Sequence, residues 1–390
     1  MYFNDKPSIF PAHCEIALLV FVMYALAFLL AYHFGADVKG VDQVLSQVKL
    51  GLYLTVVLVS IFAFLLPMLL IRGRWKIIPV VANKKNFVFL NCIFLVVYFL
   101  LKIKLLGGLT AAEYAFDSGE IEDPTWKASI FLSECIYVFA AIWVFIGSRE
   151  WFLTNIIALQ MNLMHGTRIY VMIAFISLFY VFFRHLSKVK ILITSIFGLT
   201  GLILFSYIIF LFRHGVLDQF DTDVQWLLSP VLIESVFSQW SLINVLGETK
   251  YFGEINTLHF ILDPILYTVP RFLLPDKDLL MLYFSPDLSP LGAFNGVAAS
   301  IVYLGVFFPL YWFLFGLLGA LIYQLARRSL FFRIYYFIFC TNIILRLMRD
   351  GYLIPTKIII NDFMLLAVIF ILVKTFRYFK SLVVVKFVNA

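Results

Sequence analysis

The stretch SIVYLGVFFPLYWFLFGLLGALIYQL, residues 300–325, carries no charged side chain over its whole length. A helix needs about 20 apolar residues to cross the hydrocarbon core of a bilayer, so this stretch is long enough to span one. Arg327 and Arg328 follow it after a single alanine. Because basic residues concentrate on cytoplasmic loops, they place its end inside the cell. The stretch therefore predicts a helix that crosses the membrane towards the cytoplasm.

Similar apolar runs recur along the whole chain. Of its 390 residues, 63% are hydrophobic and only 14% are charged, whereas about a quarter of the residues in a soluble domain are charged. The runs are continuous and do not alternate between apolar and polar residues, so they predict helices rather than barrel strands. We therefore expect an all-α polytopic membrane protein. The net charge of +7 fits basic cytoplasmic loops and implies no nucleic acid partner.

Ten membrane spans are predicted from the apolar runs. They cover about residues 15–34, 50–71, 87–106, 128–147, 151–164, 169–183, 191–212, 300–325, 330–347 and 358–373. Basic clusters follow the second, sixth, eighth and tenth spans, which places both termini in the cytoplasm. The chain then divides into a membrane part over 1–212, a large periplasmic loop over 213–298 and a second membrane part over 299–390.

The loop 213–298 is too polar to lie in lipid and too apolar to be an ordinary linker. Its pattern predicts two amphipathic helices, over 223–246 and 254–269. On the second helix, His259 and Asp263 are four residues apart and therefore share a face. There the carboxylate can orient the imidazole, which makes the pair a candidate for acid–base chemistry.

Five arginines lie at the predicted outer face of the membrane, against the preference of basic residues for the cytoplasm. They are Arg168, Arg213, Arg271, Arg346 and Arg349. Any one of them can pair with a carboxylate or extend to lipid headgroups. Five from separate parts of the chain predict a shared function, because ionisable groups near the membrane are costly unless they are used.

Three short motifs carry a family resemblance, namely GTR at 166–168, TVPRFLLPDKD at 268–278 and RLMRDGY at 346–352. Together with the many spans and one dominant outer loop, they resemble the O-antigen polymerase (Wzy-type) family, also called oligosaccharide repeat-unit polymerases. Many members carry an acidic residue just before the glycine that corresponds to Gly305. Here the neighbourhood is Ile-Val-Tyr at 301–303, so that role is unfilled or falls to another carboxylate. The candidates for it are Glu234, Glu254 and Asp350.

The resemblance implies a fold, a reaction and a location. The fold would be that of the multi-span lipid-phosphate-dependent glycosyltransferases, which the O-antigen ligases also resemble. The implied enzyme polymerises undecaprenyl-diphosphate-linked oligosaccharides at the periplasmic face of a bacterial inner membrane, for O-antigen or a related surface polysaccharide. Donor and acceptor are both lipid-linked. A co-polymerase that sets chain length is an expected partner, and no cofactor or metal is implied.

The implied chemistry assigns roles to the arginines. The hydroxyl of one repeat unit would attack the anomeric carbon of the other, and undecaprenyl diphosphate would leave. Guanidinium groups match phosphate oxygens bidentately, so Arg168, Arg271 and Arg349 are expected to bind the diphosphate. Arg213 and Arg346 are further candidates for this role.

The acceptor hydroxyl needs a base, or at least an acceptor that orients it. His259 with Asp263 is the first candidate for this base, followed by Glu254 and His214. Arg271 would complete the catalytic set by stabilising the charge that develops on the leaving diphosphate.

Three alternatives of other classes remain. A flippase or transporter of lipid-linked oligosaccharides would show two similar halves and ionisable residues in mid-span, whereas here the charges are predicted at span ends. Another multi-span transferase, such as an O-antigen ligase, an O-acyltransferase or a mannosyltransferase-like enzyme, would share the general layout. A non-catalytic scaffold would tolerate charge reversal at Arg168 or Arg349, which a polymerase would not.

Overall fold

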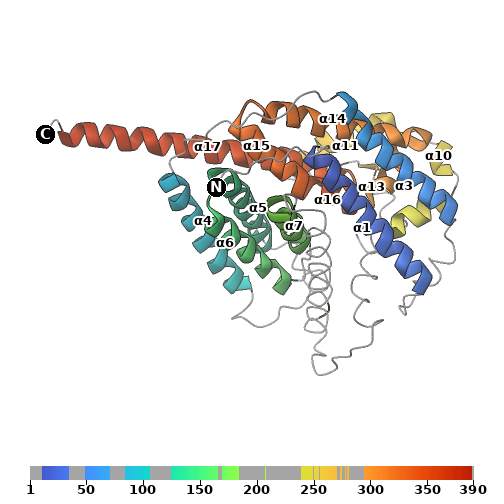
Figure 1. Ribbon diagram of the computed structural model, residues 1–390, viewed down its shortest axis with the longest axis horizontal. Helices are drawn as coiled ribbons and strands as arrows, with labels where there is room; N and C mark the ends of the chain where they lie inside the picture. The colour runs from blue at the N-terminus through green and yellow to red at the C-terminus, as the bar shows by residue number, and fades with distance from the viewer. Residues whose placement is uncertain are drawn as a thin grey trace, which may run out of the picture.

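The computed structural model is a bundle of helices, and the residues that it describes include no strand (Figure 1). The described residues are 11–34, 49–70, 84–105, 124–165, 169–183, 207, 239–248, 250–253, 255–269, 273–274, 277, 279–280 and 294–388. Over these residues the predicted all-α fold is confirmed.

Among the described residues, six helical segments are long and apolar enough to cross a membrane. They are Leu50–Leu69, Lys84–Leu105, Lys127–Ile146, Gly296–Ala326, Leu330–Arg349 and Leu353–Thr375. Each agrees with a predicted span to within five residues at either end. The second, third, fourth, eighth, ninth and tenth predicted spans therefore correspond to candidate membrane-spanning helices.

Several of these segments combine two or three helical elements. The elements are α3 (Leu50–Leu65), η1 (Leu66–Leu70), α4 (Lys84–Leu105), α5 (Pro124–Ile146), α13 (Gly296–Leu304), η6 (Gly305–Phe307), α14 (Phe308–Ala326), α15 (Leu330–Ile338), η7 (Phe339–Ile343), α16 (Ile344–Arg349) and α17 (Leu353–Val388). The last element, α17, extends well beyond the bundle in Figure 1.

Three of the other four predicted spans are also helical. The first is α1 (Ala12–Phe34). The fifth and sixth predicted spans correspond to four elements, which are α6 (Arg149–Leu159), η3 (Gln160–His165), α7 (Ile169–Leu178) and η4 (Phe179–Phe183). The seventh, over 191–212, lies outside the described residues apart from Tyr207.

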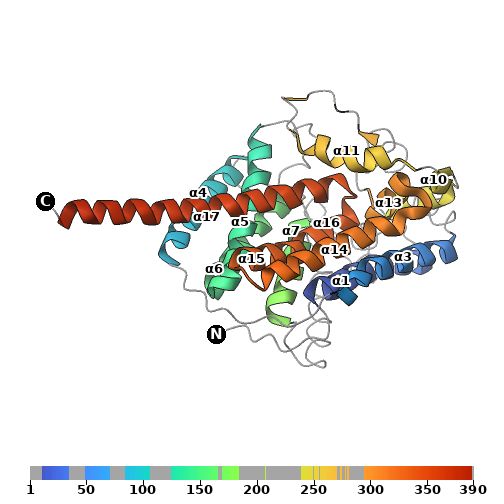
Figure 2. The same ribbon diagram turned by 90° about the horizontal axis from the view of Figure 1, so that it is seen from above.

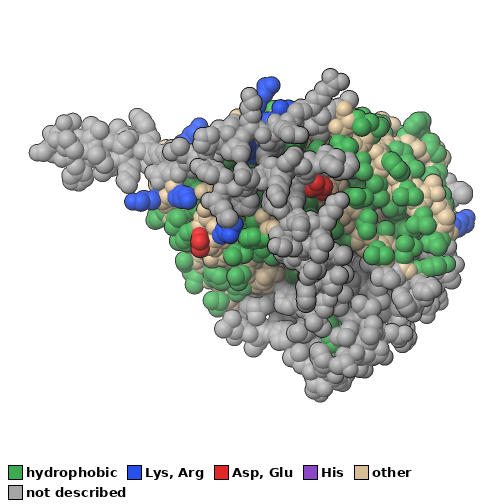
Figure 3. Space-filling view, in the orientation of Figure 1, with side chains coloured by type: hydrophobic (Ala, Val, Ile, Leu, Met, Phe, Trp, Pro, Cys, Tyr) green, Lys and Arg blue, Asp and Glu red, His purple; other side chains and the backbone are tan. Residues whose placement is uncertain are grey.

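Two of these six described spans form the interior of the bundle. In the most apolar part of each span, the share of buried residues is 83% for Leu330–Arg349 and 72% for Lys127–Ile146. The same share is only 28% for Lys84–Leu105 and for Leu353–Thr375. The outer faces of the peripheral helices carry large apolar side chains, as lipid contact requires. Figure 3 shows this apolar surface over much of the described face.

Gly316 allows α14 to lie directly against α3. A β-carbon at this position would stand 2.1 Å from the carbonyl oxygen of Phe64, so no larger residue fits unless one helix moves. Membrane helices often use small residues in this way to bring two backbones together.

The innermost span is not a uniform α-helix. Between α15 and α16 it forms the π-helical turn η7, which contains Thr341 and Asn342. A π-turn accommodates one extra residue and changes the direction of the side chains that follow it, and such turns are frequent at functional sites. Here both side chains point into the bundle, and Thr341 contacts the hydroxyl of Tyr137 on α5.

The helix α11 (Thr257–Thr268) covers one end of the bundle, beside α13 and the start of α17 (Figure 2). It confirms the core of the helix predicted over 254–269. Its apolar side chains, among them Leu258 and Ile265, are 68% and 57% exposed, while Asp263 on the opposite face is buried. The other helix predicted in the loop covers 223–246. Its described part is helical, over 239–247. The short helix α10 (Lys250–Gly253) follows it.

Candidate active site

The predicted pair on α11 is formed. His259 Nδ1 lies 3.0 Å from Asp263 Oδ1, and the imidazole is 34% exposed while the carboxylate is fully buried. A carboxylate accepts hydrogen bonds, so Nδ1 carries a proton here, and in the neutral imidazole Nε2 then has a lone pair available. The exposed imidazole can therefore accept a proton at Nε2.

Asp263 is held by two further donors. The Tyr303 hydroxyl on α13 donates to its Oδ2 over 2.7 Å, and the Leu280 backbone amide donates to the same oxygen over 2.9 Å. The carboxylate thus has partners on three sides, which fixes its orientation. Such support from surrounding hydrogen bonds is what keeps a reactive side chain in one geometry.

A proline inside α11 creates the contact that joins this helix to the turn between α16 and α17. Pro264 has no backbone N–H, so the carbonyl of Phe260 lacks its usual intrahelical partner. The Tyr352 hydroxyl donates to that carbonyl over 2.8 Å, and the rings of Phe260 and Tyr352 stack with centroids 5.1 Å apart. The positive φ of Gly351 (76°) forms the turn that carries Tyr352.

The environment of Tyr352 keeps its hydroxyl able to donate. Burial, and to a smaller extent the Asp263 carboxylate, raise the pKa of Tyr352 well above its ordinary value. The hydroxyl therefore stays protonated, and α11 stays attached to the turn that follows Arg349.

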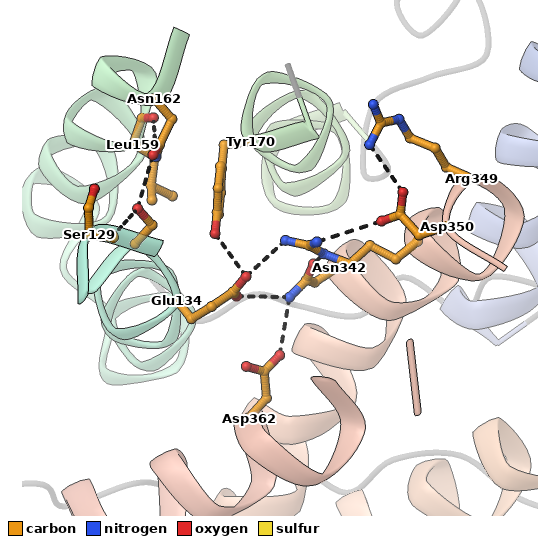
Figure 4. A network of polar contacts seen from close by, with 11 residues as sticks. Ser129, Glu134, Leu159, Asn162, Tyr170, Asn342, Arg349, Asp350 and Asp362 are labelled. Atoms are coloured by element: carbon orange, nitrogen blue, oxygen red, sulfur yellow. Dashed lines mark hydrogen bonds and ion pairs between the residues drawn. The ribbon is translucent and has the colours of Figure 1, made fainter. Parts of the chain in front are cut away.

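A buried polar network lies behind this turn (Figure 4). Arg346 on α16 donates from Nη2 to Glu134 Oε1 on α5 over 2.8 Å and from Nε to Asn342 Oδ1 over 2.8 Å. Its Nη1 lies 3.6 Å from Asp350 Oδ2. Only 10% of the Arg346 side chain is exposed, so the guanidinium is held inside the bundle.

Glu134 receives donors from three elements. Besides Arg346, the Tyr170 hydroxyl on α7 donates to Oε1 over 2.9 Å, and the Asn342 amide in η7 donates to Oε2 over 3.3 Å. A buried carboxylate requires such compensation, because an unpaired charge there is strongly unfavourable.

Asp362 is the second carboxylate of the network and is fully buried on α17. The Asn342 amide donates to its Oδ2 over 3.1 Å, so one amide group serves both Asp362 and Glu134. Its other oxygen, Oδ1, has no hydrogen-bond partner among the residues that the structure describes.

At the rim of the network, Asp350 lies between two arginines. Its Oδ2 faces Arg346, and Arg349 Nη1 donates to its Oδ1 over 3.1 Å. The Arg349 side chain is 23% exposed, against 9% for Asp350. Arg349 is therefore the more accessible of the two predicted arginines at this turn.

A second polar cluster adjoins the first through α5. Lys102 on α4 is buried, and its Nζ donates to Asn162 Oδ1 over 2.8 Å. Ser133, next to Glu134 on α5, donates to the same oxygen over 3.0 Å. The two clusters together run through the interior from α4 to α17.

No family model, no curated protein and no solved structure matches this chain.

The structure forms the predicted pair of His259 and Asp263, and it holds Arg346 and Arg349 together on α16, where both contact Asp350. The hydrogen bond from Tyr352 to Phe260 ties α11 to the turn that follows α16. The Arg346 guanidinium is buried against Glu134, and its place at the outer edge of the membrane stays a prediction. The others, Arg168, Arg213, Glu254 and Arg271, lie outside the described residues, as does His214.

Sequence reasoning missed Glu134 and Asp362. The expectation that charges sit at span ends is wrong for both, since Glu134 is seven residues inside Lys127–Ile146 and Asp362 nine residues inside Leu353–Thr375. At 1.5 Å per residue these offsets are about 10 and 14 Å. The available signal was a single acidic residue within an apolar run, which in a membrane protein indicates a functional or paired group.

Proposed function

We propose that this chain is a membrane glycosyltransferase that polymerises undecaprenyl-diphosphate-linked oligosaccharide repeat units, the activity of the family that it resembles. The observation that supports it best is the contact between α11 and the turn after α16. This contact ties the helix that carries His259 to the turn that follows Arg349, which supports a shared site with His259 as proton acceptor and Arg349 as accessible guanidinium.

His259 would act as the base. Its Nε2 takes the proton of the acceptor hydroxyl while that oxygen forms a bond to the anomeric carbon of the donor. Asp263 holds Nδ1–H and stabilises the imidazolium that results. A positioned acid–base group of this kind contributes about 10²- to 10⁴-fold to rate.

Arg349 would act on the leaving group. The bond between the anomeric carbon and the phosphate oxygen breaks, and undecaprenyl diphosphate leaves with the electron pair. A guanidinium already in place near that oxygen stabilises the developing charge without reorganisation. We assign Arg168, Arg213 and Arg271 to the same diphosphate.

The lipid-linked substrates would reach the site from the bilayer. The exposed apolar face of α11 suits the boundary between headgroups and acyl chains. We place this end of the bundle at the periplasmic face of the inner membrane and both termini in the cytoplasm. A chain-length-determining co-polymerase is the proposed protein partner.

One observation favours a second candidate, a flippase or transporter of the same lipid-linked oligosaccharide. Glu134, Arg346 and Asp362 form an ionisable cluster inside the spans, and such clusters are typical of substrate and ion pathways. The two functions differ in what their loss leaves behind.

A deletion strain tests the proposal and separates the two candidates. A polymerase deletion should leave single repeat units on the cell surface, whereas a flippase deletion should leave none. On a polysaccharide gel, the wild-type chain should restore the ladder and Arg349→Ala should give single units at normal membrane levels. Arg328→Ala is the matched control, an exposed arginine outside the candidate site, and it should restore the ladder. A normal ladder from Arg349→Ala contradicts the assignment of Arg349.

A further inference from the structure

Asp362 is a carboxyl group inside a candidate span, and the proposed chemistry does not use it. It lies nine residues inside Leu353–Thr375, and its side chain is fully buried. Figure 4 shows it on α17, below Glu134 and Asn342 in that view. Its charge state matters, because an ionised carboxylate at this depth is costly unless a cation or several donors compensate it.

Hydrogen bonds supply little of this compensation. The Asn342 amide donates to Asp362 Oδ2 over 3.1 Å, but the amide is neutral and also serves Glu134. The second oxygen, Oδ1, is buried and has no hydrogen-bond partner among the residues that the structure describes. An ionised carboxylate has about four acceptor positions, so a single donor leaves most of them unused.

The cation that attracts Asp362 is Arg346, and its guanidinium is already engaged. Nη2 donates to Glu134 and Nε donates to Asn342, while Nη1 faces Asp350. Within the network of Figure 4, three carboxyl groups therefore share two arginines. If all were ionised, this part of the chain would carry one negative charge in excess, and a single proton on Asp362 removes it.

Other titratable groups interact with Asp362 without supplying a positive charge. They are Glu134, Cys135 and Tyr137 on α5 and Tyr335 on α15. The Tyr335 hydroxyl donates to the Ile359 carbonyl, and the Tyr137 hydroxyl contacts Thr341, so both hydroxyls are engaged elsewhere. Over the described chain, α4 and α11 also pack against α17 but bring no titratable group to Asp362.

We propose that Asp362 is a proton-binding site, held in the assembled bundle as a neutral carboxylic acid with its proton on Oδ1. Oδ2 still accepts from the Asn342 amide. Uptake of the proton forms one O–H bond and consumes no other reactant, and it lets α17 pack beside Glu134 without a second buried charge. The site goes beyond the proposed function, since neither His259 nor Arg349 acts through it, and it stands for a transferase and for a transporter alike.

Infrared spectroscopy of the full chain in lipid nanodiscs at neutral pH reads the charge state. Acid and carboxylate groups absorb at different frequencies, and isotope-labelled aspartate identifies the bands that belong to aspartates. The difference between wild type and Asp362→Asn should contain a protonated-carboxyl band and no carboxylate band. Asp350→Asn is the matched control, because this aspartate lies between two arginines, and it should remove carboxylate bands instead. Loss of carboxylate bands in Asp362→Asn would overturn the proposal.

The wild type alone also decides the question if Asp362→Asn fails to fold. Its spectrum at neutral pH should contain a protonated-carboxyl band that shifts when aspartate is isotope-labelled. A spectrum without such a band rejects the proton site.

The two buried carboxyl groups should differ in their response to the loss of a charge. Asp362→Asn keeps the shape and an oxygen for the Asn342 amide, so the unfolding equilibrium constant in mild detergent should change by less than about tenfold. Glu134→Gln leaves Arg346 buried without this carboxylate and should raise that constant by about 10²- to 10³-fold. Equal losses from the two variants would mean that Asp362 is charged, contrary to the proposal.

The stability of the wild type should fall as the pH rises. Unfolded aspartate releases its proton above about pH 4, so folding at higher pH takes up a proton at Asp362. Each unit of rising pH should then favour unfolding of the wild type by about tenfold relative to Asp362→Asn. A constant difference between the two proteins from about pH 5 to about pH 7 contradicts proton binding. Replacement of sodium by potassium should leave the slope unchanged, and a slope that requires sodium would assign the site to a metal ion instead.

Discussion

The Tyr352 hydroxyl donates a hydrogen bond to the Phe260 carbonyl. It replaces the backbone N–H that Pro264 lacks. A single hydroxyl thereby joins the loop helix α11 to the turn between two spans. An unsatisfied buried carbonyl costs about 1–3 kcal/mol, so this contact is large enough to decide how α11 sits. The exposed His259 depends on it for its position relative to Arg349.

Tyr352→Phe should lower the free energy of unfolding of the purified protein by about 1–3 kcal/mol, because the Phe260 carbonyl loses its donor. In a Pro264→Ala background the new backbone N–H can bond that carbonyl, so the same change should have a smaller effect. Thermal unfolding in detergent measures both. Equal losses in the two backgrounds would contradict this account of Pro264.

The Tyr352 contribution should also depend on pH. A group whose pKa is higher in the folded than in the unfolded protein stabilises the folded state fully at any pH below its unfolded pKa. For tyrosine the unfolded pKa is about 10. The difference in unfolding temperature between wild type and Tyr352→Phe should therefore be constant from neutral pH to about 10 and shrink above it. If the difference in unfolding temperature already falls at neutral pH, the raised pKa of Tyr352 is contradicted.

Asp263→Asn should lower the rate of glycan elongation by about 10²- to 10⁴-fold, the range of acid–base contributions. Asparagine can still accept from Tyr303 and Leu280, but its amide then donates towards His259 Nδ1. The imidazole would carry its proton on Nε2 and could no longer accept one there. Membrane levels should stay normal, and an unchanged rate would remove this pair from the chemistry.

The helical elements show which contacts a sequence can predict. Span lengths are local properties of apolar runs, and the His259–Asp263 pair follows from one helical turn, so both were predictable. The Glu134–Arg346 pair joins residues 212 positions apart and depends on how α5 packs against α16. The π-turn η7, which directs Asn342 inward, leaves no distinct mark in the apolar pattern.

The crossing of α3 and α14 gives a prediction for packing. Gly316→Ala should lower the unfolding free energy by about 1–3 kcal/mol, since its β-carbon would overlap the Phe64 carbonyl. Gly51→Ala is the matched control on α3, because nothing lies within 4 Å of its β-carbon. That change should be neutral or slightly stabilising, as alanine favours helix. Similar losses from both would contradict the close approach.

The whole bundle has two ends that should face opposite sides of the membrane. Lys250 is exposed in α10 at the end that carries α11, while Arg328 is exposed beyond the far end of α14. The proposed site is at the first of these ends, together with the turn after α16. The orientation of the bundle therefore decides which compartment supplies the substrates.

Cysteine labelling measures this orientation. After replacement of the native cysteines, Lys250→Cys should react with a membrane-impermeant thiol reagent in intact spheroplasts. Arg328→Cys should react only after permeabilisation, because basic span ends face the cytoplasm. The reverse pattern would place the candidate site in the cytoplasm.

The long sequence separation between Glu134 and Arg346 has a consequence for biogenesis. The ribosome completes α5 well before it makes the helix that carries Arg346, so during synthesis the Glu134 carboxylate enters the membrane without its final partner. The late hairpin of the last two spans, Leu330–Arg349 and Leu353–Thr375, brings both the arginine and the Asn342 amide. A chain that stops before this hairpin would retain an uncompensated charge in its core, which quality-control proteases can recognise. Assembly of the interior is thus completed only when the last two helices insert.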